Sequence, residues 1–155
     1  RLAGGNAVSA TLNVTRLDYL GAPLRDANRY SATIGYADRT IFAFMIGGTE
    51  RTLRSPFRHF GNDFVGIQGG TEYPLSTRVA IVGNLAAEYR HYLGTDPLYL
   101  GGRHDVQLDA AIGLRAILTE GISLRPRVTV TRNDSNFALY NFRRATASIA
   151  LRAEF

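Results

Sequence analysis

The chain has no cysteine, no lysine and no long hydrophobic run. Without cysteine there is no disulfide framework, no thiol nucleophile and no thiolate metal site. A transmembrane helix needs about 20 consecutive apolar residues, but charged or strongly polar residues interrupt every hydrophobic run within about ten positions. These absences exclude an α-helical membrane protein.

The basic residues are all arginine: 18 of them stand against 13 acidic residues, which gives a formal net charge of +5. This excess is compatible with an anionic partner such as nucleic acid or lipopolysaccharide phosphate, but a coding bias toward arginine is the favoured explanation. Only Arg143 and Arg144 are adjacent, and the other arginines are scattered singly. The sequence therefore predicts no nucleic-acid patch.

At 155 residues, with no internal repeat or linker, the chain is expected to form a single domain over residues 1–155. It starts at Arg1 without an initiator methionine and without a charged-then-apolar leader. We expect either a mature, processed product or a piece of a longer protein.

Alternation of apolar and polar residues is the dominant pattern, and it recurs in eight segments of roughly ten residues. The sixth segment is the clearest, with Val106, Leu108, Ala110, Ile112, Leu114 and Ala116 on one face. In the third segment both faces are rather apolar, and we assign Phe42, Phe44 and Ile46 to the apolar face. The pattern predicts eight β-strands.

The predicted connections alternate between long and short. Long connections are expected around residues 21–23, at 50–61, at 93–102 and at 133–141, and short ones at 38–39, 74–77 and 119–121. Outer-membrane barrels have long extracellular loops and short periplasmic turns. We therefore predict an all-β, antiparallel transmembrane β-barrel in the bacterial outer membrane, with both termini in the periplasm.

A soluble barrel of the lipocalin type has the same alternation with its apolar side inward. Three features favour lipid outside: the polar face lacks lysine, glycines recur on it, and tyrosines gather near strand ends, where interfacial girdles lie. The predicted interfacial aromatic residues are Tyr19, Tyr30, Tyr36, Tyr73 and Tyr89.

Charged residues on the polar face are predicted to line the lumen. They are Glu88, Asp105, Asp109, Arg115, Arg125, Arg127, Arg152 and Glu154. In a closed eight-stranded barrel these side chains would form a salt-bridged plug. In a larger barrel they would line an aqueous lumen and bias it toward anions.

The last seven residues resemble the β-signal of outer-membrane proteins, with Ile149, Leu151 and the terminal Phe155 at alternating positions. This resemblance implies recognition by the barrel-assembly machinery. Residues 132–144, and more loosely Arg103 to Asp105, resemble the last hairpin region of the surface lipoprotein assembly modifier family.

Barrels of that family are linked to periplasmic tetratricopeptide domains and have more strands. The resemblance implies translocation or surface assembly of a protein such as a lipoprotein. It also implies that this chain is the C-terminal part of a larger barrel, whereas the residues alone are compatible with a small closed structural or adhesive barrel.

An enzyme is the third alternative. Asp134-Ser135-Asn136 resembles the second half of the His-x-Ser-Asn signature of outer-membrane lipid A deacylases, but Asn133 stands where the histidine general base belongs. We therefore expect no catalysis.

Two further groups of residues are candidate binding sites. His91, His104 and Asp105 could bind a metal, although residues of these types at a strand rim are more often solvated, and we expect neither metal nor cofactor. The loop with Arg51, Arg54, Arg58 and His59 could contact lipopolysaccharide phosphates. The expected partners are outer-membrane lipids and lipopolysaccharide, the assembly machinery and a translocated protein.

Overall fold

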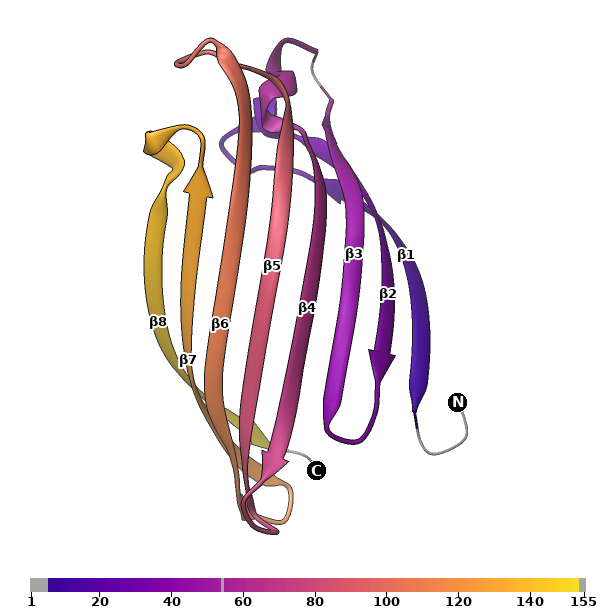
Figure 1. The fold of residues 1–155 in the computed structure, drawn as a ribbon, viewed down its shortest axis with the longest axis vertical. Helices are drawn as coiled ribbons and strands as arrows, with labels where there is room; N and C mark the ends of the chain where they lie inside the picture. Colours follow the sequence, from indigo (N-terminus) through magenta and orange to yellow (C-terminus); the bar gives the residue numbers. More distant parts are fainter. Residues whose placement is uncertain (1–5, 54, 154–155) are drawn as a thin grey trace.

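The computed structural model describes residues 6–53 and 55–153, which form one antiparallel sheet of eight strands (Figure 1). The strands are β1 (Ala7–Leu17), β2 (Ala27–Ala37), β3 (Ile41–Thr52), β4 (Asn62–Pro74), β5 (Val79–Asp96), β6 (Gly101–Thr119), β7 (Ile122–Ser135) and β8 (Phe142–Ala153). The prediction of eight antiparallel strands in an all-β chain is confirmed.

The strands follow one another across the sheet in chain order, from β1 to β8. Each inner strand pairs with the strand before it and the strand after it. Within the described residues β1 and β8 each pair on one side only, so the sheet is open and not closed into a barrel.

As predicted, the β1–β2, β3–β4 and β7–β8 connections are long and the β2–β3 and β6–β7 turns are short, but the β5–β6 turn of residues 97–100 is no longer than the β4–β5 turn of residues 75–78. At one end of the sheet, the long-loop end, lie the 3-10 helices η1 (Pro23–Arg25), η2 (Ser55–Phe60) and η3 (Ala138–Tyr140) and the β5–β6 turn. The other end, the short-turn end, holds the tight turns β2–β3, β4–β5 and β6–β7, and there β1 begins and β8 ends (Figure 1).

One predicted loop is wrong in length. Instead of a loop over 93–102, β5 continues to Asp96 and β6 begins at Gly101. Gly94 lies within β5 and allows a close approach of η2, because a Cβ there would overlap the backbone of His59.

The register sorts the strand residues onto two faces. One row across the sheet contains Ile34, Met45, Ile67, Ala87 and Leu108, and its side is called the apolar face. The neighbouring row contains Gly35, Phe44, Gln68, Ala86, Asp109 and Thr131, and its side is called the polar face. Successive residues of a strand point to opposite faces, so these two rows fix the face of the other paired residues, except beyond the register shifts at residues 91–95 of β5 and 117–119 of β6.

The face assigned to the third predicted segment is wrong. Because Gly35 pairs with Phe44 and Thr33 with Ile46, the side chains of Phe42, Phe44 and Ile46 lie on the polar face. Ala43 and Met45 lie on the apolar face. Both faces of this strand are apolar in sequence, so only its pairing with β2 decides between them.

Aromatic rings on the polar face lie against glycines of neighbouring strands. A Cβ at Gly35 would overlap the ring of Phe44, one at Gly70 the ring of Phe42, and one at Gly48 both the ring of Phe64 and the carbonyl oxygen of Tyr30. Glycine leaves room for a ring to lie close to the backbone, and such pairs help to fix strand register.

We expect Gly48→Ala to lower the free energy of unfolding by about 1–3 kcal/mol, because the added methyl group forces the backbone of β2 and the Phe64 ring to move. Gly83→Ala is the matched control, since a Cβ there meets no atom closer than 3.9 Å. Urea unfolding of both variants measures the difference, and equal stability of the two would contradict the packing described.

Candidate functional site

The predicted lumen-lining charges share the polar face. Register places Glu88 opposite Gln107, Asp105 opposite Arg90, and Asp109 between Ala86 and Thr131. The register places four further residues on the polar face as well: Arg115, Arg125, Arg127 and Arg152. Glu154 lies outside the described residues.

The ion pairs are made with partners that the predicted set omitted. Arg103 pairs with Asp105, Arg90 with Glu88, and Arg115 with Glu72. In the first two pairs the partners are two residues apart on one strand, a spacing that puts both side chains on the same face. Asp109 accepts hydrogen bonds from Thr131 Oγ1 at 2.5 Å and from Gln107 Nε2 at 2.8 Å.

Arg125 and Arg127 lie nearer the short-turn end, where they line a cavity of about 320 Å³ together with Glu72 and Arg115. Within the described part of the chain no carboxylate is in ion-pair contact with either of them. The polar face therefore has a paired, largely neutralised region toward the long loops and a basic region toward the short turns.

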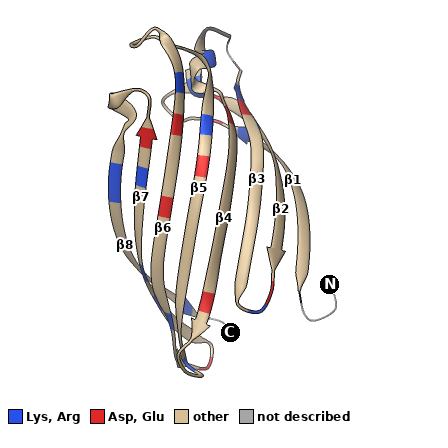
Figure 2. Ribbon diagram, viewed as in Figure 1, with Lys and Arg blue, Asp and Glu red and all other residues tan. Residues whose placement is uncertain are grey.

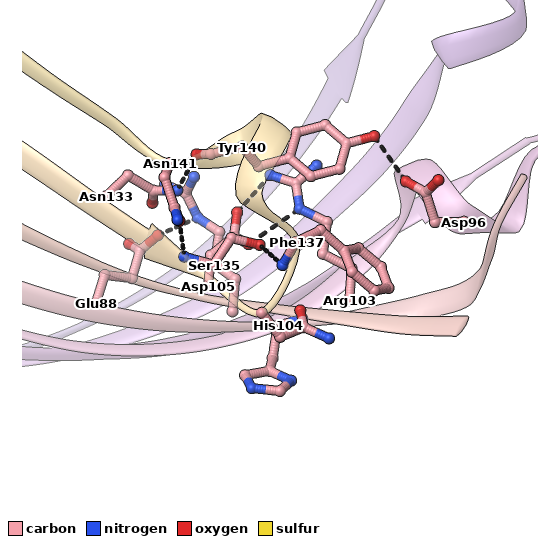
Figure 3. A network of polar contacts seen from close by, with 12 residues as sticks. Glu88, Asp96, Arg103, His104, Asp105, Asn133, Ser135, Phe137, Tyr140 and Asn141 are labelled. Atoms are coloured by element: carbon pink, nitrogen blue, oxygen red, sulfur yellow. Dashed lines mark hydrogen bonds and ion pairs between the residues drawn. The ribbon is translucent and has the colours of Figure 1, made fainter. Parts of the chain in front are cut away.

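Asp105 is the centre of a polar network at the long-loop end of the polar face (Figure 3). Its side chain is 2% exposed and accepts hydrogen bonds from Arg103, at 3.0 Å from Nε, and from the side chains of Ser135 and Asn133. The Arg103 guanidinium lies over the rings of Tyr92 at 4.1 Å and Tyr140 at 3.5 Å. The two rings shield the guanidinium of Arg103 from water, while Asp105 supplies its counter-charge.

The same network fixes η3 and the β7–β8 connection. Asn133 Nδ2 donates to the carbonyl oxygen of Tyr140 at 2.9 Å, and the Tyr140 hydroxyl donates to Asp96 Oδ2 at 2.6 Å. The hydrogen bond to Asp96, together with burial, raises the pKa of the Tyr140 phenol above its ordinary value. The phenol therefore stays protonated and remains a donor at neutral pH.

A cavity of about 530 Å³, called the rim cavity, lies at this end of the polar face. Its lining includes Arg25, Arg29, Arg90, Arg103, Tyr92 and Tyr140. Arg29 stacks over Phe64 at 4.3 Å, and Arg25 lies over Tyr19 at 4.9 Å and over Phe60 at 5.2 Å. Glu50 and Asp96 also line it, and Glu88 and Asp105 pair with Arg90 and Arg103, so the positive charge is balanced.

The apolar face is exposed along the sheet. A shallow hollow of about 1040 Å³ lies on it, lined by residues such as Ile34, Met45, Ile67, Leu85 and Leu108. Those five side chains remain exposed in spite of the hollow. Figure 2 shows charges at the ends of β1, β2 and β3 and none along their central stretches.

Four of the predicted interfacial tyrosines lie on the apolar face and are exposed: Tyr30, Tyr36, Tyr73 and Tyr89. Tyr30 and Tyr89 lie toward the long-loop end, and Tyr36 and Tyr73 toward the short-turn end. Tyr19 differs, because it lies in the β1–β2 connection and lines the rim cavity.

In the predicted assembly signal, Ile149 and Leu151 lie on the apolar face of the edge strand β8, with 76% and 67% exposed. Phe155 lies outside the described residues. The two described residues continue the apolar face to the edge of the sheet.

The three residues of the proposed metal site do not come together. His91 and His104 pair across β5 and β6, but Asp105 follows His104 directly and therefore points to the other face. Within residues 6–53 and 55–153, no group of three or more candidate ligands comes together.

Three residues of the deacylase-like segment, Asn133, Ser135 and Asn136, position the β7–β8 connection through hydrogen bonds. Asn133 is 3% exposed and bonded as described, and the Ser135 amide donates to Asn141 Oδ1 at 2.5 Å. Asn136 links the β7–β8 connection to β6. Its side chain accepts a hydrogen bond from His104 N and donates one to the Gly102 carbonyl oxygen, both at 2.9 Å. Asp134 pairs with Arg132 at 2.7 Å.

The residues considered for lipopolysaccharide contact are dispersed. Arg51 pairs with Asp63 at 3.1 Å, the His59 ring lies tilted against that of Phe60 at a centroid distance of 4.1 Å, and Arg58 is exposed. Arg54 lies outside the described residues. Three separate environments result, without a shared anion site among Arg51, Arg58 and His59.

The chain was compared with known proteins at three levels. No protein-family profile, no curated protein and no solved structure matches it. Among the described residues, none of the helices has the length and apolar character needed to cross a membrane.

Proposed function

We propose that the chain is an integral protein of the bacterial outer membrane, in which this sheet forms all or part of a transmembrane β-barrel. The observation that carries the proposal is the apolar face, which is exposed over the strands while the polar face holds paired charges. In water such a face is an aggregation liability, whereas in a bilayer it is the lipid-contacting surface.

The tyrosines give the apolar face a height that suits a membrane. Tyr89 pairs with Val65, which is eight residues from Tyr73 on β4, so at about 3.3 Å per residue the two tyrosines are ~26 Å apart along the strands, or ~20 Å along the membrane normal at a tilt of ~40°. Outer-membrane barrels have an apolar band about 25 Å tall between two aromatic girdles. Outer-membrane lipids and lipopolysaccharide are therefore the proposed surroundings.

In this proposal the short-turn end faces the periplasm, because short turns are periplasmic in outer-membrane barrels. Both termini are then periplasmic, since β1 begins and β8 ends there. Strand β8, with Ile149 and Leu151 on its apolar face, is the proposed recognition element for the barrel-assembly machinery.

The proposed role is non-enzymatic: translocation or surface assembly of a protein such as a lipoprotein. What supports it is the resemblance of residues 132–144 to the assembly-modifier barrels. A small closed structural or adhesive barrel is the second candidate, favoured by Phe42, Phe44 and Phe64 on the polar face, which fill space that an open pore would leave to water.

Reconstitution tests the membrane assignment. We expect the urea-unfolded chain, diluted into phospholipid vesicles, to become protease-protected and to migrate differently on gels with and without heating. Solubility as a folded monomer in buffer, without any gain of protection from vesicles, would contradict the proposal.

A cell-based measurement tests the role. In cells lacking the full-length protein, surface lipoproteins are expected to lose accessibility to external protease, and the wild-type gene should restore it. Unchanged surface exposure of the lipoproteins would favour the structural or adhesive barrel. A change in lipid A mass would instead support the lipid A-modifying enzyme.

A further inference from the structure

Within residues 6–53 and 55–153, the outer sides of the edge strands β1 and β8 have no partner strand. In a bilayer each unsatisfied group costs several kcal/mol, so the edges need partners. Three partners are available in principle: the other edge of the same chain, a second copy, or strands outside this sequence.

The polar face favours a narrow, filled interior. The rings of Phe42 and Phe44 lie 5.5 Å apart between centroids, and glycines of the neighbouring strands β2 and β4 make room for them. Apolar rings in this position suit the interior of a small barrel, which side chains fill completely, and not a water-filled lumen. Eight strands are the number at which the interior is just wide enough for this.

The register also supplies the stagger that closure needs. A row of directly paired residues starts at Ala10, three residues into β1 at the short-turn end. It passes through Ile34, Met45, Ile67, Ala87, Leu108 and Arg132 and ends at Arg143. Arg143 is the second residue of β8, at the long-loop end, so the row climbs from one end of the sheet to the other.

In a closed barrel, a row of paired residues that is followed once around the barrel comes back to the first strand at a different residue. The number of residues between the start and the end of the row is the shear number. An eight-stranded barrel with a shear of 8 has strands tilted by about 36°, and tilt rises with shear, so a shear of ten gives ~42°. Membrane barrels have tilts of about 35–45°, and a shear of about ten lies well inside that range. The displacement must be even, because an odd one would put apolar residues of β8 beside polar-face residues of β1.

We propose that β1 and β8 of one chain pair antiparallel with this stagger, so that Ala10 lies opposite Ala153 and Leu17 opposite Thr146. This seam rests on the proposed membrane barrel and specifies its closure. On the apolar face it brings Leu12 beside Leu151 and Val14 beside Ile149. On the polar face it brings Asn13 beside Ala150 and Thr15 beside Ser148, which are small enough to lie within a filled interior.

The absence of cysteine makes the seam directly testable. Asn13→Cys is combined in turn with Ala150→Cys, Ser148→Cys and Arg152→Cys, and each double variant is folded in vesicles and oxidised. Directly opposed residues can form a disulfide, whereas a shift of two residues separates the Cα atoms by about 8 Å, beyond the ~7 Å limit. Non-reducing gels distinguish an intramolecular disulfide from a dimer.

We expect an intramolecular disulfide in Asn13→Cys/Ala150→Cys, at least fivefold more abundant than in the other two variants. A preference for position 148 or 152 would overturn the stagger. Dimers only, or no disulfide in any variant, would overturn closure within one chain.

Vesicle insertion, measured by protease protection on the same variants, separates this inference from the proposed function. Insertion without an intramolecular disulfide contradicts the seam alone. Failure of the wild-type chain to insert into vesicles would contradict the membrane assignment.

Discussion

Ile112→Arg is expected to lower the free energy of unfolding from a bilayer by about 2–4 kcal/mol, the usual cost of arginine at the midplane of a membrane barrel. Ile112 lies well inside the 19-residue strand β6, on the apolar face, with 62% of its surface exposed. In the proposed orientation this side chain touches acyl chains, so a guanidinium there must be buried in hydrocarbon. Reversible urea unfolding in lipid vesicles measures the change.

Leu139→Arg is the matched control, because Leu139 is also 62% exposed but lies in η3, outside the strands. We expect its effect to stay within about 0.5 kcal/mol, as for most surface substitutions. If the two substitutions had equally small effects, the apolar face would not lie in lipid.

Asp105→Ala is expected to destabilise the folded chain by about 3–5 kcal/mol, because it leaves the Arg103 guanidinium buried without its counter-charge. Arg103 lies between Tyr92 and Tyr140, and Asp105 also accepts hydrogen bonds from Asn133 and Ser135. One substitution therefore removes the centre of the network that fixes η3. Urea unfolding gives the free energy, and protease cleavage in residues 136–141 reports whether the connection loosens.

Asp63→Ala is the control for charge removal, since Asp63 pairs with Arg51 at 3.1 Å and both side chains are about half exposed. An exposed pair contributes about 0–1 kcal/mol. A further control replaces both Arg103 and Asp105 by leucine, which removes the unpaired charge. We expect this double variant to be more stable than Asp105→Ala, and equal stability would mean that the lone arginine is not the cause of the loss.

The strands could be predicted because alternation specifies both a strand and its two faces when the faces differ in polarity. In β6 the residues from Asp105 to Arg115 alternate almost without interruption, and the structure reproduces both faces. In β3 the sequence Phe42 to Gly47 has little polarity difference, so the sequence pattern alone could not choose a face. That choice depends on pairing with β2, which is a non-local contact.

The site was predicted in part. Alternation along each strand placed the seven described residues of the predicted lumen-lining set on one face, but it could not determine which carboxylate each arginine meets. The Arg115–Glu72 pair joins residues 43 apart in the sequence, on β6 and β4, and depends on the register of three strands. The rim cavity was missed because η1, η2 and η3 contribute to it from separate connections, and short 3-10 helices leave little sequence signal.

The most direct test of the membrane orientation compares two adjacent residues of β6. Ile112 lies on the apolar face and Ala111 on the polar face, opposite Asn84 and Thr129. A fluorophore attached to a single cysteine at each position is examined in vesicles that contain brominated lipids. The proposed orientation predicts strong quenching at position 112 and weak quenching at 111, and the reverse order, or equal weak quenching at both, would contradict it.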